Sequence, residues 1–143
     1  MTQKSMSRLE KRGDLKYEVL SRDLITRILG TVAYDKAFFF YADVGKPTGD
    51  FAVSLSDFGN KINSVGPESL NFHFKRGDFE NWIGEVIGDH ELAGRMKHMR
   101  SLKGTFKSKS TMKRKLHAAI KDRVAELQDL WRHALTWPES VIA

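Results

Sequence analysis

The feature that most constrains the fold is a long apolar period near the C-terminal end of the chain. Apolar residues recur there every three or four positions: Met112, Leu116, Ile120, Val124, Leu127, Trp131 and Ala134. Because an α-helix turns once in about 3.6 residues, this spacing places all of them on one face. The pattern predicts a single helix over residues 110–135, and we expect Trp137-Pro138 to end it because the residue before a proline disfavours helical geometry.

Shorter patterns upstream predict several short helices and one β-hairpin. Residues 14–29 have apolar side chains at helical spacing, which indicates one or two amphipathic helices ending at Gly30. Two apolar runs, 37–41 and 51–53, flank the turn-rich sequence GKPTG. Runs of this length joined by Gly and Pro favour two short strands with a loop between them.

Several residues in the middle of the chain are typical of helix N-termini. Ser54 and Asp57 fit the spacing of a capping box, with Asp in the acidic position, and Pro67 suits the first turn of the next helix. Asp78 and Asp89 are candidate N-caps of two further helices. Together these patterns predict a mainly α fold, a bundle of short helices with a small β-hairpin and a long C-terminal helix.

The length and composition fit one domain over residues 1–143, of which residues 1–13 are polar, basic and expected to be flexible. The chain has no cysteine, which excludes disulfides and cysteine-based metal sites. No stretch approaches the roughly 20 apolar residues that cross a bilayer, and the first residues do not resemble a secretory signal. We therefore expect a cytoplasmic protein without a membrane partner.

The positive charge of the chain is concentrated in one stretch. Residues 95–123 contain eleven Lys or Arg and one acid, Asp122, a net charge of +10, whereas the whole chain carries +6. We expect residues 100–109 to form a basic linker that leads into the basic half of the long helix. Such a stretch can neutralise several phosphates and release their counterions, which predicts binding of DNA or structured RNA without strong sequence specificity. The candidate binding residues are Lys103, Lys107, Lys109, Lys113, Arg114 and Lys115, with Arg95, Lys97 and Arg100 as extensions.

A second feature is a set of aromatic, Gly-Asp and Leu-Ala elements at fixed offsets within residues 69–96. The pattern reads F-H, then D-F-x-x-W-[IV]-x-x-V-[IL]-G-D-x-x-L-A, and is met by Phe72, His73, Asp78, Phe79, Trp82, Ile83, Val86, Ile87, Gly88, Asp89, Leu92 and Ala93. In this signature the chain resembles a family of uncharacterised, mainly archaeal domains of unknown function. The resemblance covers residues 37–99 as a family-like core. It implies an archaeal cytosolic origin and brings no chemistry with it.

The signature has two interpretations from its residues alone. Its apolar members fall on one helical stripe, Phe79, Trp82, Ile83 and Val86. The stripe, with capping residues on either side, favours a structural role. The alternative is a ligand site around His73, Asp78 and Asp89, and it stays open.

Known catalytic motifs are missing from the sequence. GKPTG lacks the spacing of a P-loop, and the chain has no dinucleotide fingerprint, GxSxG or HExxH. We expect binding without catalysis, with no cofactor and no metal. Besides nucleic-acid binding, two rival functions stay open: a protein-interaction or homo-oligomerisation module that uses the long helix and its Trp131 face, and an enzyme whose site the sequence does not reveal. The basic stretch itself can also be a solvated surface offset by acids elsewhere in the fold.

Overall fold

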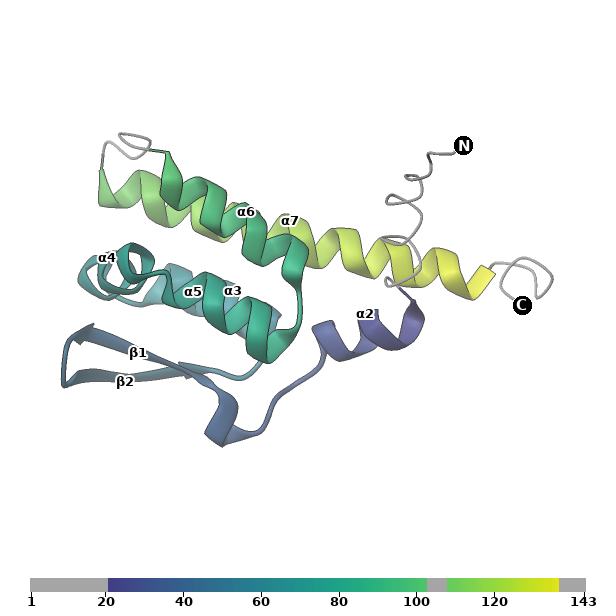
Figure 1. Ribbon diagram of the computed structural model, residues 1–143, viewed down its shortest axis with the longest axis horizontal. Helices are drawn as coiled ribbons and strands as arrows, with labels where there is room; N and C mark the ends of the chain where they lie inside the picture. The colour runs from purple at the N-terminus through teal and green to yellow at the C-terminus, as the bar shows by residue number, and fades with distance from the viewer. Residues whose placement is uncertain (1–20, 103–107, 137–143) are drawn as a thin grey trace.

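The computed structural model describes residues 21–102 and 108–136 (Figure 1). The described elements, in chain order, are α2 (Arg22–Leu29), η1 (Tyr34–Lys36), β1 (Phe38–Asp43), β2 (Lys46–Ala52), α3 (Leu55–Ser64), α4 (Pro67–Arg76), α5 (Asp78–Trp82), η2 (Ile83–Ile87), α6 (His90–Ser101) and α7 (Lys109–Thr136). The predicted fold class is confirmed, since short helices, one hairpin and a long C-terminal helix make up this part of the chain. Residues 14–20 and Trp137-Pro138, for which the sequence also makes predictions, lie outside the described residues.

The elements form three layers (Figure 1). Helices α6 and α7 lie side by side in one outer layer, α3, α4 and α5 form the middle layer, and the hairpin packs on the far side of α3 and α4. The short helix α2 lies against the C-terminal half of α7, and α7 also contacts α3 and α4. Helix α7 is therefore the element against which most of the other helices pack.

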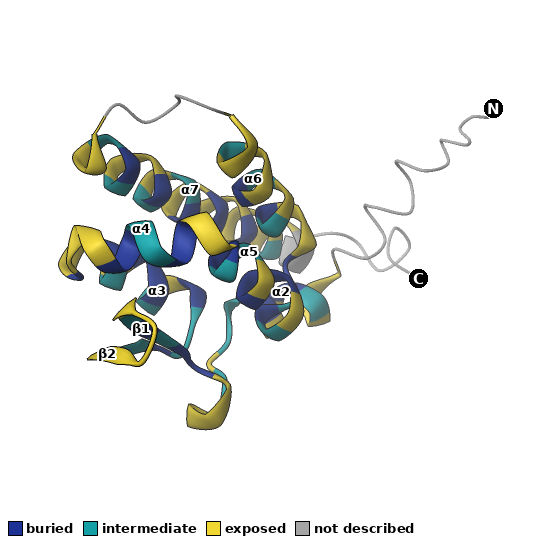
Figure 2. Cartoon of the chain, turned by 60° about the vertical axis from the view of Figure 1, so that its left-hand side comes forward, coloured by how far each residue is buried: buried dark blue, intermediate teal, exposed yellow. Residues whose placement is uncertain are grey.

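The apolar core lies between these layers (Figure 2). The predicted stripe of α7 is confirmed, because Met112, Leu116, Ile120, Val124 and Leu127 are all buried and Trp131 packs at the edge of the core. Beneath the stripe lies an aromatic cluster made by Phe38, Phe40, Phe58, Phe79 and Trp82, whose rings meet mostly edge to face. Edge-to-face pairs are favourable because the positive ring edge meets the negative ring face.

The hairpin is longer than the sequence predicts, and its turn is shorter. Asp43 pairs with Lys46, so Val44 and Gly45 alone form the turn, with Gly45 at a φ of 70°. The expectation that GKPTG forms a loop is therefore wrong. Pro47 is tolerated in β2 because β2 has a neighbour on one side only within the described two-stranded sheet, where a missing N–H costs little.

The predicted helix starts are confirmed at three positions. The Ser54 hydroxyl accepts a bond from the Asp57 backbone N–H at 3.0 Å, and the Asp57 carboxylate accepts one from the Val53 N–H at 3.0 Å. Pro67 occupies the first turn of α4. Asp89 caps α6 by accepting a bond from the Leu92 N–H at 3.2 Å. These bonds satisfy backbone donors that a helix N-terminus leaves without partners.

The prediction that Asp78 is an N-cap is wrong. Gly77 holds that position with a φ of 77°, and Asp78 is the first residue of α5. The carboxylate of Asp78 turns back toward α4, where it contacts His73 and Arg76. After α5 the chain widens into the π-helical turn η2, which ends at Gly88 in the left-handed conformation. None of the described helices combines the length and apolar composition of a membrane-spanning segment.

Candidate functional site

The candidate nucleic-acid-binding residues are distributed over two helices. Lys109, Lys113, Arg114 and Lys115 lie in the first two turns of α7, and Lys97 lies on α6. All of these except the half-buried Lys113 are exposed. Lys103 and Lys107 lie outside the described residues, so the predicted linker over residues 100–109 is described only at its two ends.

The N-terminal half of α7 is uniformly positive. Residues 109–121 contain five Lys or Arg and no acid, and the first turn of the helix has no acidic residue. Backbone N–H groups also leave partial positive charge at a helix N-terminus. Within the described part of the chain, no ion pair involves Lys109, Arg114 or Lys115. The local charges therefore repel one another, and the described residues supply no counterion to them.

Two lysines of α7 bond to neutral groups of α3. The Lys113 ammonium donates to the backbone carbonyl of Asn63 at 2.9 Å, and the Lys121 ammonium donates to the side-chain oxygen of Asn60 at 3.2 Å. Since neither acceptor is charged, both lysines keep their contribution to the positive potential. Their positions are fixed, however, so they are less free to follow a ligand than Lys109 or Arg114.

The two predicted arginine extensions are ion-paired within the chain. Arg95 bonds to Glu126 through both terminal nitrogens, at 2.9 and 3.1 Å, and to Glu91 at 3.0 Å. Arg100 forms a two-point contact with Glu80 at 2.8 and 3.0 Å. The bond to Glu126 is the main reason that the pKa of Arg95 is raised, and the bond to Glu80 likewise raises the pKa of Arg100. Their charge is largely compensated by these carboxylates.

Arg123, the last cation of the basic stretch, is a core residue. Its guanidinium bonds to both oxygens of Asp89, at 2.8 and 3.0 Å, and to Glu126 at 3.1 Å. Burial lowers the pKa of Arg123 more than any other single cause raises it, but the bonds to Asp89 and Glu126 together with the charge of Asp89 outweigh burial, so the net shift is upward. Nothing in the sequence pattern separates this arginine from its exposed neighbours, because its partner is far away along the chain.

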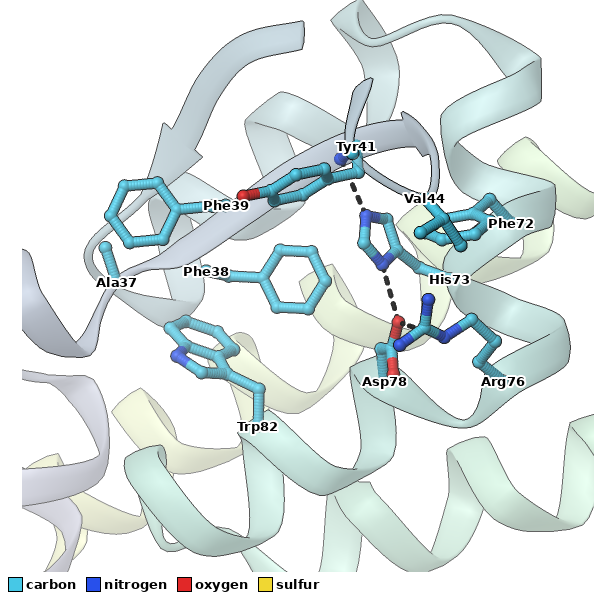
Figure 3. A pocket seen from close by; sticks show the side chains of 11 residues that line it. Ala37, Phe38, Phe39, Tyr41, Val44, Phe72, His73, Arg76, Asp78 and Trp82 are labelled. Carbon is cyan, nitrogen blue, oxygen red and sulfur yellow. Dashed lines mark hydrogen bonds and ion pairs between the residues drawn. The ribbon is translucent and has the colours of Figure 1, made fainter. Parts of the chain in front are cut away.

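A separate cavity of about 400 Å³ opens between the hairpin and helices α4 and α5 (Figure 3). The rings of Phe39 and Tyr41 lie on its hairpin side, Trp82 lies on the opposite side, and Phe38 lies between them. The remaining lining residues are Ala37, Val44, Gly45, Phe72, His73, Arg76 and Asp78. The sequence pattern does not indicate this cavity, although the aromatic run 38–41 and the F-H pair of the signature supply much of its lining.

His73 lies at the inner end of this cavity with both ring nitrogens in use (Figure 3). Nε2 accepts a bond from the Tyr41 backbone N–H at 2.8 Å, and Nδ1 donates to Asp78 at 2.8 Å. Burial lowers the pKa of His73, and the bond to Asp78 only partly opposes this shift. These contacts favour the neutral tautomer with its proton on Nδ1, and the Nε2 lone pair is engaged by the Tyr41 N–H.

The predicted ligand site of His73, Asp78 and Asp89 is only partly assembled. His73 and Asp78 are in contact, whereas Asp89 is buried elsewhere against Arg123. Among the described residues, no group of three or more His, Asp or Glu is arranged to hold a metal ion. The His73–Asp78 bond joins α4 to α5, and the bond from the Tyr41 N–H to His73 joins the hairpin to α4.

The apolar face around Trp131, on which the oligomerisation alternative depends, contacts α2 of the same chain. The Trp131 indole N–H donates to the Thr26 hydroxyl at 3.1 Å, and the Arg22 guanidinium lies 5.2 Å from the ring centroid.

The chain matches no family model, no curated protein and no solved structure. The resemblance of residues 37–99 to uncharacterised archaeal domains stays a prediction.

Proposed function

We propose that this protein binds the phosphate backbone of nucleic acid, with little sequence preference, through the N-terminal half of α7. The proposed α7 surface is the first two turns of the helix, with the cations Lys109, Arg114 and Lys115 spaced around them and Lys97 of α6 as an extension. The observation that carries the proposal is the absence of any acid from residues 109–121, combined with the lack of ion pairs to these α7 cations among the described residues.

Self-repulsion among the cations of the free protein favours binding of a polyanion. Several cations next to a helix N-terminus raise the free energy of that segment, because the helix dipole is positive at the same end. A polyanion removes this repulsion and releases its own condensed counterions when it binds. Arg95 and Arg100 are left out of the proposed surface, since moving them onto a phosphate would leave Glu126 and Glu80 without their partners. Lys103 and Lys107 stay in the proposal as binding residues predicted from the sequence.

The contacts proposed here position a backbone and do not distinguish bases. Lysine and arginine side chains that bond to phosphate oxygens carry no sequence information. Affinity should therefore vary little among duplexes of different sequence, and it should fall steeply with salt.

The test is a titration of labelled duplex DNA and structured RNA at several salt concentrations. The variant replaces three cations of α7, Lys109→Gln, Arg114→Gln and Lys115→Gln. The slope of log affinity against log salt on duplex DNA should decrease by about 0.9 for each phosphate that the variant no longer neutralises. We expect the triple variant to neutralise two or three fewer phosphates than the native chain and to bind at least tenfold more weakly at low salt.

A matched control removes the same charge elsewhere, with Arg27→Gln, Lys36→Gln and Arg132→Gln. These residues are exposed and lie on α2, η1 and the C-terminal part of α7. The control variant should bind nearly as the native chain does. Equal weakening by the two triple variants, or no duplex binding by the native chain at low salt, would show that the α7 surface is not a binding site.

A further inference from the structure

The cavity between the hairpin and α4 has the composition of a site for a planar ligand. Its walls are rings from three elements: Phe39 and Tyr41 of β1, Phe72 of α4 and Trp82 of α5. Phe39, Tyr41 and Phe72 are half-buried, so part of each side chain stays accessible. Cavities of a few hundred Å³ with mainly apolar walls and few polar groups are typical of small-ligand sites.

The charged groups of the cavity, Arg76 and Asp78, lie at one end of it (Figure 3). The Arg76 Nε atom lies 3.3 Å from Asp78 Oδ2, and the Arg76 guanidinium stacks over the Phe72 ring at 4.6 Å. The Arg76 side chain is 53% exposed and the Asp78 side chain 25%. Both contacts of Asp78 with the described side chains use Oδ2. Oδ1 and the terminal nitrogens of Arg76 can therefore accept and donate bonds to a ligand.

We propose that this cavity binds an unpaired nucleobase, stacked on the half-buried rings with its polar edge toward Arg76 and Asp78. The rings supply sequence-tolerant stacking, because every base has a π-face. A donor and an acceptor side by side match a base edge, which presents both kinds of group. Two sources share this chemistry, a free nucleotide and a base of a single strand. For the strand, the proposal rests on the proposed function of α7.

The placement of the cavity suits a strand that also contacts α7. Helix α4 packs against α7, and Figures 1 and 2 place α4 beside the N-terminal half of α7. The C-terminal end of α4 also meets the end of α6, since Arg100 Nη2 lies 3.3 Å from the position of a Cβ atom at Gly77. The cavity and the basic surface are thus in adjacent layers on either side of α4, and a strand that reaches both must pass this helix.

The first experiment uses NMR spectra of the ¹⁵N-labelled native chain at high salt, where backbone phosphate contacts are weakened. The probes are the four ribonucleoside monophosphates, with ribose 5-phosphate as a control that carries the anion without a base. We expect saturable shifts of the Phe39, Tyr41 and Phe72 amides and of the Trp82 indole N–H with the nucleotides only. Equal shifts with ribose 5-phosphate, or no shifts with any nucleotide and with single strands, would overturn the proposal.

Variants test which side chains bind the base. Phe72→Ala should weaken nucleotide binding by about tenfold, because it removes a stacking surface. Arg76→Gln tests the polar end without a risk to folding, since Arg76 is exposed, and should weaken binding several-fold. Leu130→Ala is the control, because Leu130 is a large apolar residue with 37% exposure that lies on the C-terminal part of α7 and does not line the cavity. Equal loss in Leu130→Ala and Phe72→Ala would contradict the site.

The two sources and the two proposals are separated by comparing nucleic acids. Phe72→Ala should weaken the binding of single-stranded oligonucleotides but not that of duplex DNA. The α7 triple variant should weaken the binding of both and leave the nucleotide-induced NMR shifts unchanged. If duplexes fail to bind while nucleotides shift the cavity residues, the function proposed for α7 is wrong and the cavity is a free-nucleotide site. If duplexes bind while nucleotides and single strands leave the cavity unperturbed, only the α7 proposal survives.

Discussion

Asp89 and Arg123 form a buried two-point ion pair that joins the start of α6 to the middle of α7. The guanidinium meets both carboxylate oxygens, at 2.8 and 3.0 Å, and the two side chains are 1% and 4% exposed. Asp89 also caps α6 through the Leu92 N–H. A single carboxylate therefore satisfies a helix N-terminus and a buried cation, and the Gly-Asp element of the sequence signature acquires a structural explanation.

We predict that Arg123→Ala lowers the free energy of unfolding by about 3–5 kcal/mol. The substitution leaves the Asp89 carboxylate buried without its charged partner, and such uncompensated charges are strongly destabilising. Urea denaturation followed by circular dichroism measures the effect. Arg132→Ala is the control, because its ion pair with Asp129 is well exposed and should contribute less than about 1 kcal/mol. A similar decrease in both variants would show that burial of the Asp89–Arg123 pair does not increase its contribution to the free energy of unfolding.

The contacts of His73 predict a loss of stability in acid. Because burial lowers the pKa of His73, the unfolded chain binds the proton more readily than the folded chain. The contribution of neutral His73 is fully present above the ordinary value of 6.5 and is lost as the pH falls below it. Protonation would also convert Nε2 into a donor facing the Tyr41 N–H. The hairpin should then loosen from α4.

The measurement is the free energy of unfolding of the native chain and of His73→Phe from neutral pH to about pH 5. The variant loses both hydrogen bonds and is less stable at neutral pH, but it has no titrating group at this position. The difference between the two proteins should narrow as the pH falls. A constant difference would show that His73 does not titrate in this range, and the pH dependence of its NMR signals would confirm that directly.

The secondary structure could be predicted where the signal is local. Ser54 and Asp57 reveal a helix start because the capping bonds span three or four residues, and the stripe of α7 repeats every turn. Asp78 has the same local signal, yet its carboxylate bonds to His73 instead, because the left-handed Gly77 reverses the chain between α4 and α5. A local pattern does not contain that tertiary contact.

Two glycines make a matched test of helix packing. A Cβ atom at Gly59 of α3 would lie 3.1 Å from Ile120 Cγ2 of α7, whereas one at Gly94 of α6 would have no neighbour within 4 Å. Gly59→Ala should lower the free energy of unfolding by about 1–3 kcal/mol, since the branched Ile120 side chain is fully buried and has little room to move. Gly94→Ala should raise it by about 0.5–1 kcal/mol through helix propensity. Thermal denaturation of the two variants shows whether each substitution lowers or raises stability. An increase in the stability of both variants would show that α3 and α7 are not tightly packed at Gly59.

The candidate site was predictable in charge but not in arrangement. The excess of cations in residues 95–123 is visible in the sequence, but Arg95, Arg100 and Arg123 are compensated by carboxylates 20 to 34 residues away along the chain. The aromatic cavity combines β1, α4 and α5, and its lining depends on how the hairpin docks. The ion pairing of these arginines and the assembly of the cavity both depend on tertiary contacts, which a single sequence without a repeated pattern does not specify.

The basic start of α7 should be unfavourable for stability and favourable for binding, so one substitution can separate the two. Lys109→Glu places an acid in the first turn of α7, where it interacts favourably with the helix dipole. It also replaces a repulsive pair with Lys113, four residues along the helix, by an attractive Glu–Lys pair. The free energy of unfolding should increase by about 0.5–1 kcal/mol.

The same variant should bind duplex DNA more weakly than the native chain, because a cation that meets a phosphate is replaced by a repulsive charge. Lys109→Gln is the control and should show a smaller change in each quantity, since it removes the cation without adding an acid. The prediction requires that Lys109→Glu raises stability and lowers the affinity for duplex DNA. Urea denaturation and DNA titration on the same samples measure the two quantities. If Lys109→Glu reduced both quantities, the cation would be a structural residue of α7, and its role in binding would have no support from this experiment.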